Sequence, residues 1–150
     1  MALNRDFECL TVNGVCDLTT KNIIAGSPLT INADGTFKLA KAGDPFVGLS
    51  FNYYHTGKND VTGGEWFADS GKLAIVKIAQ VTLAADVIDG VEVFPFVKDG
   101  VYTPGHQVCV NADGVLAPIA DSDETSEAVA TIVAFDAQKG ELTLFVNAQK

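Results

Sequence analysis

The sequence predicts an all-β protein: a single β-barrel or sandwich-like domain of short strands, built on two related hairpin units, with little helix. Turn pairs ending in glycine recur about every eight to twelve residues, among them Asn13-Gly14, Asp34-Gly35, Asp89-Gly90 and Asp113-Gly114. Such pairs supply the positive-φ residues of tight hairpins. The runs between them are rich in Val, Ile, Thr and Phe, as strands are. Apolar residues make up 47% of the 150 residues and charged residues 19%, which is enough material for a core.

We expect eight strands from these runs. In chain order they are Leu29–Ile31, Phe37–Leu39, Phe46–Tyr54, Leu73–Leu83, Val91–Val97, Gln107–Val110, Val129–Phe135 and Leu142–Val146. One segment, Thr125–Ala137, also fits a helix capped by Thr125 or Ser126. Its β-branched run Thr131-Ile132-Val133 favours a strand instead.

An internal repeat is visible in the sequence. Residues 26–37 read GSPLTINADGTF and residues 105–116 read GHQVCVNADGVL, at an offset of 79. We interpret them as two copies of one hairpin unit in pseudo-symmetric halves of one domain. Shared hairpin chemistry alone is the alternative explanation. The predicted organisation is an N-terminal arm or first strands over 1–24, then a barrel-like domain over 25–150 with repeats at about 26–50 and 105–135.

Charge and composition disfavour several classes of function. The net charge is −9, and residues 99–150 carry eight acidic and two basic side chains. A phosphate backbone repels such a surface, so we expect no nucleic-acid partner. The longest apolar stretch, near Leu73–Leu83, is interrupted by polar residues and is too short to span a bilayer. The first ten residues lack the apolar region of a signal peptide, which predicts synthesis in the cytoplasm and no membrane partner.

Residues with metal or catalytic chemistry are few. The two histidines, His55 and His106, and the three cysteines, Cys9, Cys16 and Cys109, lack the paired spacing of a zinc site. An odd number of cysteines suits free thiols in a reducing compartment. The acidic stretch from Asp121 to Glu127 lacks the sixth-position glycine and twelfth-position glutamate of a calcium loop. We therefore expect no catalytic residues, no metal and no cofactor, and a protein that is not an enzyme.

Two segments are candidate contact surfaces. Aromatic side chains flank the polar stretch Thr56–Glu65, and long loops with Trp and Tyr are often interfaces. Alternatively, these aromatics cap the barrel from inside. The N-terminal segment is either an arm that adds to a neighbour's sheet or a first strand of this domain. The candidate interface residues are Phe7, Tyr53, Tyr54, His55, Trp66 and Phe67.

Residues 98–148 resemble the C-terminal half of phage head decoration (cement) proteins. The shared pattern is a glycine turn, an apolar pair entering a strand, a polar glycine turn, an alanine-rich loop and a final G-x-L-x-L-x-V-like strand. Residues 25–50 look like a first appearance of the same unit. The loop Thr56–Gly64 has no counterpart in the second copy, and residues 1–24 have no match in the pattern.

The resemblance implies a β-barrel-like cement subunit, often a homotrimer, on the outer surface of the phage head. It implies the major capsid protein as partner, stabilisation of the expanded head by bridging capsomers, and no catalytic residues. The alternatives are a tail-associated or other phage structural protein, a glycan-binding β-module that stacks sugars on Tyr53, Tyr54 and Trp66, and a small hydrolase.

Overall fold

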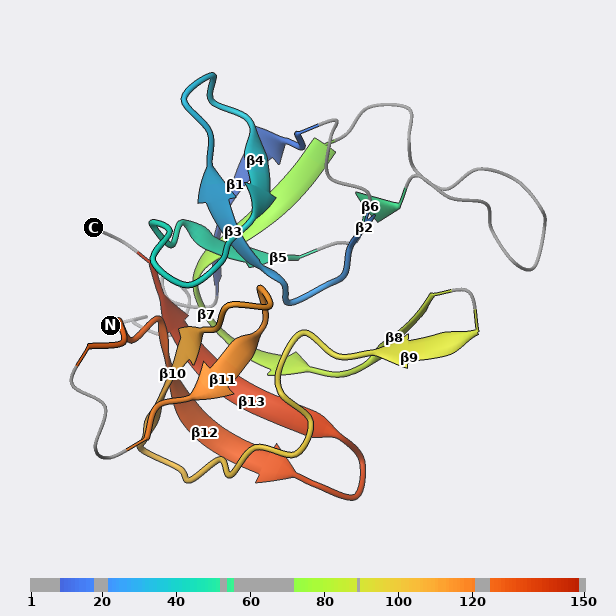
Figure 1. The fold of residues 1–150 in the computed structure, drawn as a ribbon, viewed down its shortest axis with the longest axis vertical. Coiled ribbons are helices and arrows are strands. Elements are labelled where there is room, and N and C mark those ends of the chain that lie inside the picture. Colours follow the sequence, from blue (N-terminus) through green and yellow to red (C-terminus); the bar gives the residue numbers. More distant parts are fainter. Residues whose placement is uncertain are drawn as a thin grey trace, which may run out of the picture.

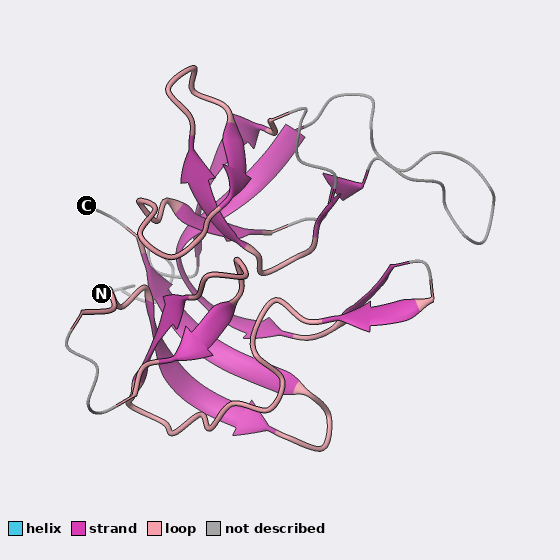
Figure 2. Ribbon diagram, viewed as in Figure 1, coloured by secondary structure: helices cyan, strands magenta, loops and turns pink. Residues whose placement is uncertain are grey.

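The computed structural model describes residues 9–17, 22–51, 54–55, 72–88, 90–120 and 125–148, and all regular secondary structure in these ranges is β (Figure 2). This confirms the predicted all-β class. The strands are β1 (Cys9–Val15), β2 (Asn22–Ile23), β3 (Pro28–Ile31), β4 (Phe37–Leu39), β5 (Gly48–Ser50), β6 (Tyr54–His55), β7 (Lys72–Leu83), β8 (Asp86–Ile88), β9 (Val91–Val93), β10 (Gln107–Val110), β11 (Leu116–Pro118), β12 (Ala130–Asp136) and β13 (Glu141–Asn147).

The main sheet has nine strands and curls into a half-barrel. Its order is β11-β10-β12-β13-β7-β5-β3-β4, with β1 paired to β7 off this path. The 12-residue strand β7 is the longest of the described strands and runs through both halves of the molecule (Figure 1). Two smaller sheets, β2-β6 and β8-β9, lie outside it. The described strands pair with one another in antiparallel fashion, as expected for a chain whose strands are joined mainly by short turns.

The two hairpins of the repeat have the same backbone hydrogen bonds. In the first, the amide of Asn32 donates to the carbonyl of Thr36 at 2.8 Å; in the second, Asn111 donates to Val115 at 2.9 Å. The turn glycines Gly35 and Gly114 have φ angles of 86° and 83°. Both turns therefore use the left-handed backbone conformation that glycine adopts at low cost. The hairpins β3-β4 and β10-β11 are structurally equivalent along their length.

The equivalence extends beyond the hairpins. In the first copy Pro28 pairs with Leu49, and in the second copy the equivalent residue Gln107 pairs with Thr131. Leu49 pairs in turn with Val76 on the next strand, and its equivalent Thr131 pairs with Phe145.

The fifth strand of each copy, β1 in the first and the second half of β7 in the second, is also paired in an equivalent way. Val12 of β1 pairs with Ile75, and Val81 of β7 pairs with Leu144. The chain thus holds two copies of one five-stranded unit. We call β1, β3, β4, β5 and residues 72–76 the first unit, and residues 78–83, β10, β11, β12 and β13 the second unit. Strand β7 ends the first unit and begins the second.

Each unit has its own apolar core. The smaller core is formed by Cys16, Ile23, Leu29, Leu73 and Ile75. Their equivalents in the second unit, Phe96, Tyr102, Val108, Leu142 and Leu144, all lie in the larger core. The first two positions hold aromatic rings in the second unit, where Phe96 and Tyr102 meet edge to face with centroids 5.8 Å apart.

Several predicted strand bounds were wrong. Phe46–Tyr54 was predicted as one strand, but its described residues belong to two different sheets, with Gly48–Ser50 in one and Tyr54–His55 in the other. Val91–Val97 ends as a strand at Val93, shortly before Pro95, which has no N–H to donate to a ladder. The strands Phe37–Leu39 and Gln107–Val110 have the predicted bounds. The segment Thr125–Ala137 contains β12 and no helix in its described residues, as the β-branched run indicated.

Candidate functional site

Most of the predicted contact residues lie outside the part of the chain that the structure describes. This holds for Phe7, Tyr53, Trp66 and Phe67. Tyr54 and His55 form the backbone of β6, where Tyr54 pairs with Ile23 and His55 with Asn22. The aromatic contact surface therefore stays a prediction.

The residues with metal or nucleophile chemistry are dispersed. Among the described residues, no three His, Cys, Asp or Glu side chains lie close enough to hold a metal ion. Cys16 is buried at the end of β1, and Cys109 is half-buried on β10. His106 is exposed in the turn before β10, where its carbonyl accepts from the amide of Ile132 at 2.8 Å.

Two groups have pKa values moved by burial. Burial, aided by the adjacent Asp17 carboxylate, raises the pKa of the Cys16 thiol to about 11. A thiol with so high a pKa is almost entirely protonated at neutral pH and is a poor nucleophile. Burial also raises the pKa of Tyr102, and its hydroxyl donates to the carbonyl of Val97 at 2.6 Å. Both groups act as structural members of a core.

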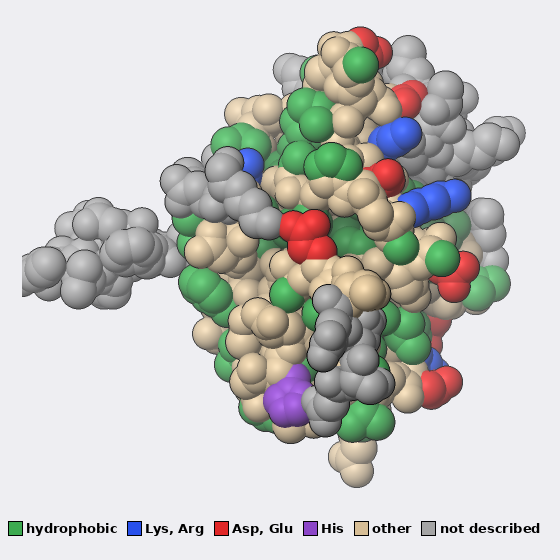
Figure 3. Space-filling view, turned by 60° about the vertical axis from the view of Figure 1, so that its left-hand side comes forward, with side chains coloured by type: hydrophobic (Ala, Val, Ile, Leu, Met, Phe, Trp, Pro, Cys, Tyr) green, Lys and Arg blue, Asp and Glu red, His purple; other side chains and the backbone are tan. Residues whose placement is uncertain are grey.

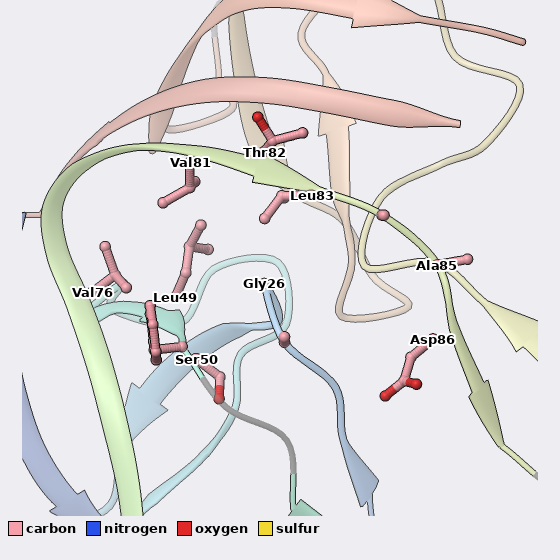
Figure 4. Close-up of a pocket in the computed structure, with 12 residues that line it drawn as sticks. Gly26, Leu49, Ser50, Val76, Val81, Thr82, Leu83, Ala85 and Asp86 are labelled. Carbon is pink, nitrogen blue, oxygen red and sulfur yellow. The ribbon is translucent and has the colours of Figure 1, made fainter. Parts of the chain in front are cut away.

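A cleft lies between the two units (Figure 4). It has a volume of about 470 Å³. Its walls come from the turn before β3, from β5, and from β7 with the segment after it. The lining residues are Ala25, Gly26, Leu49, Ser50, Phe51, Val76, Val81, Thr82, Leu83, Ala84, Ala85 and Asp86.

The cleft is lined mainly by apolar side chains. In Figure 4 the side chains of Leu49, Val76 and Val81 point toward one another, and Asp86, the carboxylate of the lining, lies at the far end. Leu49 and Val76 are 1% and 2% exposed, so they already pack into the core of the second unit. The cleft lining therefore offers apolar contact with one carboxylate and few other polar groups, and this suits packing between units better than acid–base chemistry.

The outer surface carries several large apolar side chains. Those described as exposed are Val12, Val15, Ile31, Phe51, Val87, Val91, Val101, Val133 and Phe145. On the face shown in Figure 3, apolar groups are spread among polar ones, with acidic and basic side chains interspersed. The described part of the chain has no helix long and apolar enough to cross a membrane.

Comparison with known proteins gives one informative similarity. No protein-family model matches the sequence, and no curated protein matches it. A solved structure does match: the head fiber gp8.5 N base of bacteriophage phi29, with a TM-score of 0.54 and 12% identity. The match covers 94% of this chain and 96% of that chain. At this identity the similarity establishes a shared fold that extends over nearly the whole of both chains.

Proposed function

We propose that this chain is a structural protein of a phage head that binds the outer capsid surface and stabilises the expanded shell. The observation that carries the proposal is the fold shared over 94% of the chain with a phage head fiber base. The resemblance of residues 25–50 and 98–148 to head decoration proteins is independent support from the sequence.

The physical mechanism is avidity on a repeating lattice. A subunit that contacts two neighbouring capsomers multiplies weak contacts, because the second contact forms at a high effective concentration. A protein that binds only the expanded shell stabilises that state by mass action. The role needs no catalytic residues, which suits the dispersed thiols, imidazole and carboxylates of the described chain.

Co-sedimentation with phage heads tests the proposal. Purified protein is mixed with expanded heads that lack it, and the number of bound chains per head is measured. We expect saturable binding at a fixed stoichiometry and greater resistance of the decorated heads to heat. Unexpanded heads and heads already saturated with the protein are the matched controls. Absence of saturable binding would discard the capsid role, and binding to tails or to sugars would identify one of the alternatives.

The predicted contact residues are the first to change once binding is measured. Phe7→Ala tests the N-terminal segment, and Trp66→Ala tests the aromatic segment. If either segment contacts the shell, its variant needs a higher protein concentration for half-saturation, because Trp and other aromatic residues are frequent interface anchors. Val101→Ala is a suitable control, since Val101 is 80% exposed and lies in neither segment.

A further inference from the structure

The contact between the two units buries one face of the first unit. Leu49 and Val76 pair across β5 and β7 and point away from the core of their own unit into the larger core. Beside them, the turn at Gly26 lies against the second unit: a Cβ at Gly26 would stand 2.6 Å from Cδ2 of Leu83 and 3.3 Å from Cγ of Pro95. We call this surface of the first unit its docking face.

The second unit has the same face, and there it is open. Thr131 and Phe145, the equivalents of Leu49 and Val76, pair across β12 and β13. Phe145 is 42% exposed, whereas Val76 is 2% exposed. A Cβ at Gly105, the equivalent of Gly26, would meet nothing within 4 Å. The docking face of the second unit therefore presents an aromatic side chain that no described part of this chain covers.

The first unit exposes apolar residues at two of the equivalent acceptor positions. In the second unit, the strand that lines the cleft opposite the docking face presents Val81, followed by Ala84. The equivalent residues on β1 are Val12 and Val15, which are 39% and 51% exposed. The two surfaces that touch each other inside the chain thus each have an equivalent that is exposed and apolar. These two exposed surfaces lie at opposite ends of the repeat.

We propose that a second copy of this chain covers these surfaces, with the β12-β13 face around Phe145 of one copy packed on the β1 surface around Val12 of the next. The packing uses the positions by which the first unit contacts the second within one chain, with Gly14 and the neighbouring Phe37 ring at the position of Leu83. The two surfaces are different, so the contact is heterologous and each added copy leaves one surface of each kind free. Assembly therefore continues until a ring closes or the concentration limits it. This inference does not depend on the proposed capsid role.

Complementary variants test the proposal in purified protein. Phe145→Asp and Val12→Asp each place a charge in an apolar contact, where its desolvation opposes binding. Wild-type protein should associate with increasing concentration in sedimentation velocity, and each variant alone should stay monomeric. An equimolar mixture of the two should form a dimer and nothing larger, because each variant keeps the surface that the other has lost. Val101→Asp, which adds the same charge to an exposed valine outside both surfaces, should associate like wild type.

The mixture also controls for folding, since only folded chains complement each other. Phe145→Thr, a milder change on a strand, should weaken association while it keeps the thermal unfolding of the parent. The proposal is overturned if wild-type protein is monomeric at every concentration, if either Asp variant associates like wild type, or if the mixture contains only monomers.

Discussion

Substituting the two equivalent turn glycines by alanine measures how tightly the units press on each other. Gly26 and Gly105 are the third residues of equivalent turns in the two copies, with φ angles of 90° and 86°. Their amides donate equivalent hydrogen bonds, to Ser50 at 2.7 Å and to Ile132 at 2.8 Å. The two substitutions therefore carry the same backbone cost, about 1–2 kcal/mol for an L residue in the left-handed region.

The surroundings of the two glycines make the difference. A methyl group at Gly26 would stand 2.6 Å from Cδ2 of Leu83, a side chain that is 6% exposed and would have to shift. Overpacking of this kind costs a further 1–3 kcal/mol or so. At Gly105 the methyl group would point into open space. Gly26→Ala should thus lower the free energy of unfolding by roughly twice as much as Gly105→Ala.

Urea unfolding followed by circular dichroism measures both variants. The midpoint should fall further for Gly26→Ala, with the dependence on urea unchanged in both. Leu83→Ala supplies the control for the cause: it should make Gly26→Ala less costly, whereas its effect should simply add to that of Gly105→Ala. Equal midpoints for the two glycine variants would show that the Gly26 turn is not packed against the second unit, and the reasoning would fail.

Two further predictions concern the cores. Tyr102→Phe should cost about 0.5–1.5 kcal/mol in urea unfolding, because the hydroxyl bond to the Val97 carbonyl is lost but that carbonyl still accepts from the amide of Gly100 at 3.2 Å. A loss several times larger would mean that the hydroxyl holds more of the core than this bond. Cys16, with its pKa raised from 9.0 to about 11, favours the folded state while its thiol is neutral, so stability should fall as pH rises from 9 toward 11. Cys16→Ala should flatten that part of the profile, and an unchanged slope would contradict the assignment.

The strands that the sequence predicts well are those bounded by turn chemistry. Asp34-Gly35 and Asp113-Gly114 fix their hairpins locally, so the strands on either side follow from a few neighbouring residues. The segment that contains β1 was predicted either as an arm or as a first strand of this domain. The sequence left both open, because the pairing of β1 with β7 joins residues far apart in sequence and its own alternation is weak. Strand β11, the second strand of the Asp113-Gly114 hairpin, was predicted without bounds. It contains Pro118, which is tolerated because the strand is at the end of the sheet order.

The candidate site was less accessible to sequence reasoning. The cleft is lined by residues that lie between Ala25 and Asp86 in the sequence. The path of β7 through both units determines which of them lie side by side. Apolar patterning cannot show that one strand pairs with strands of both units. Either half of Leu73–Leu83 has the same composition as an ordinary core strand. The signal that was present is the offset of 79 between the two hairpins, which gives the equivalent positions within them. The equivalents on the other strands follow only from the strand pairings.

The difference between the two cores determines which unit can change its conformation more easily. The second unit fills the positions of Cys16 and Ile23 with Phe96 and Tyr102, and these rings bury more apolar surface. The first unit compensates by pressing Leu49 and Val76 onto the larger core, so its stability depends on its neighbour. Regions with few buried apolar contacts open at lower free energy than the rest of a protein. The first unit is accordingly expected to open at a lower free energy than the second unit.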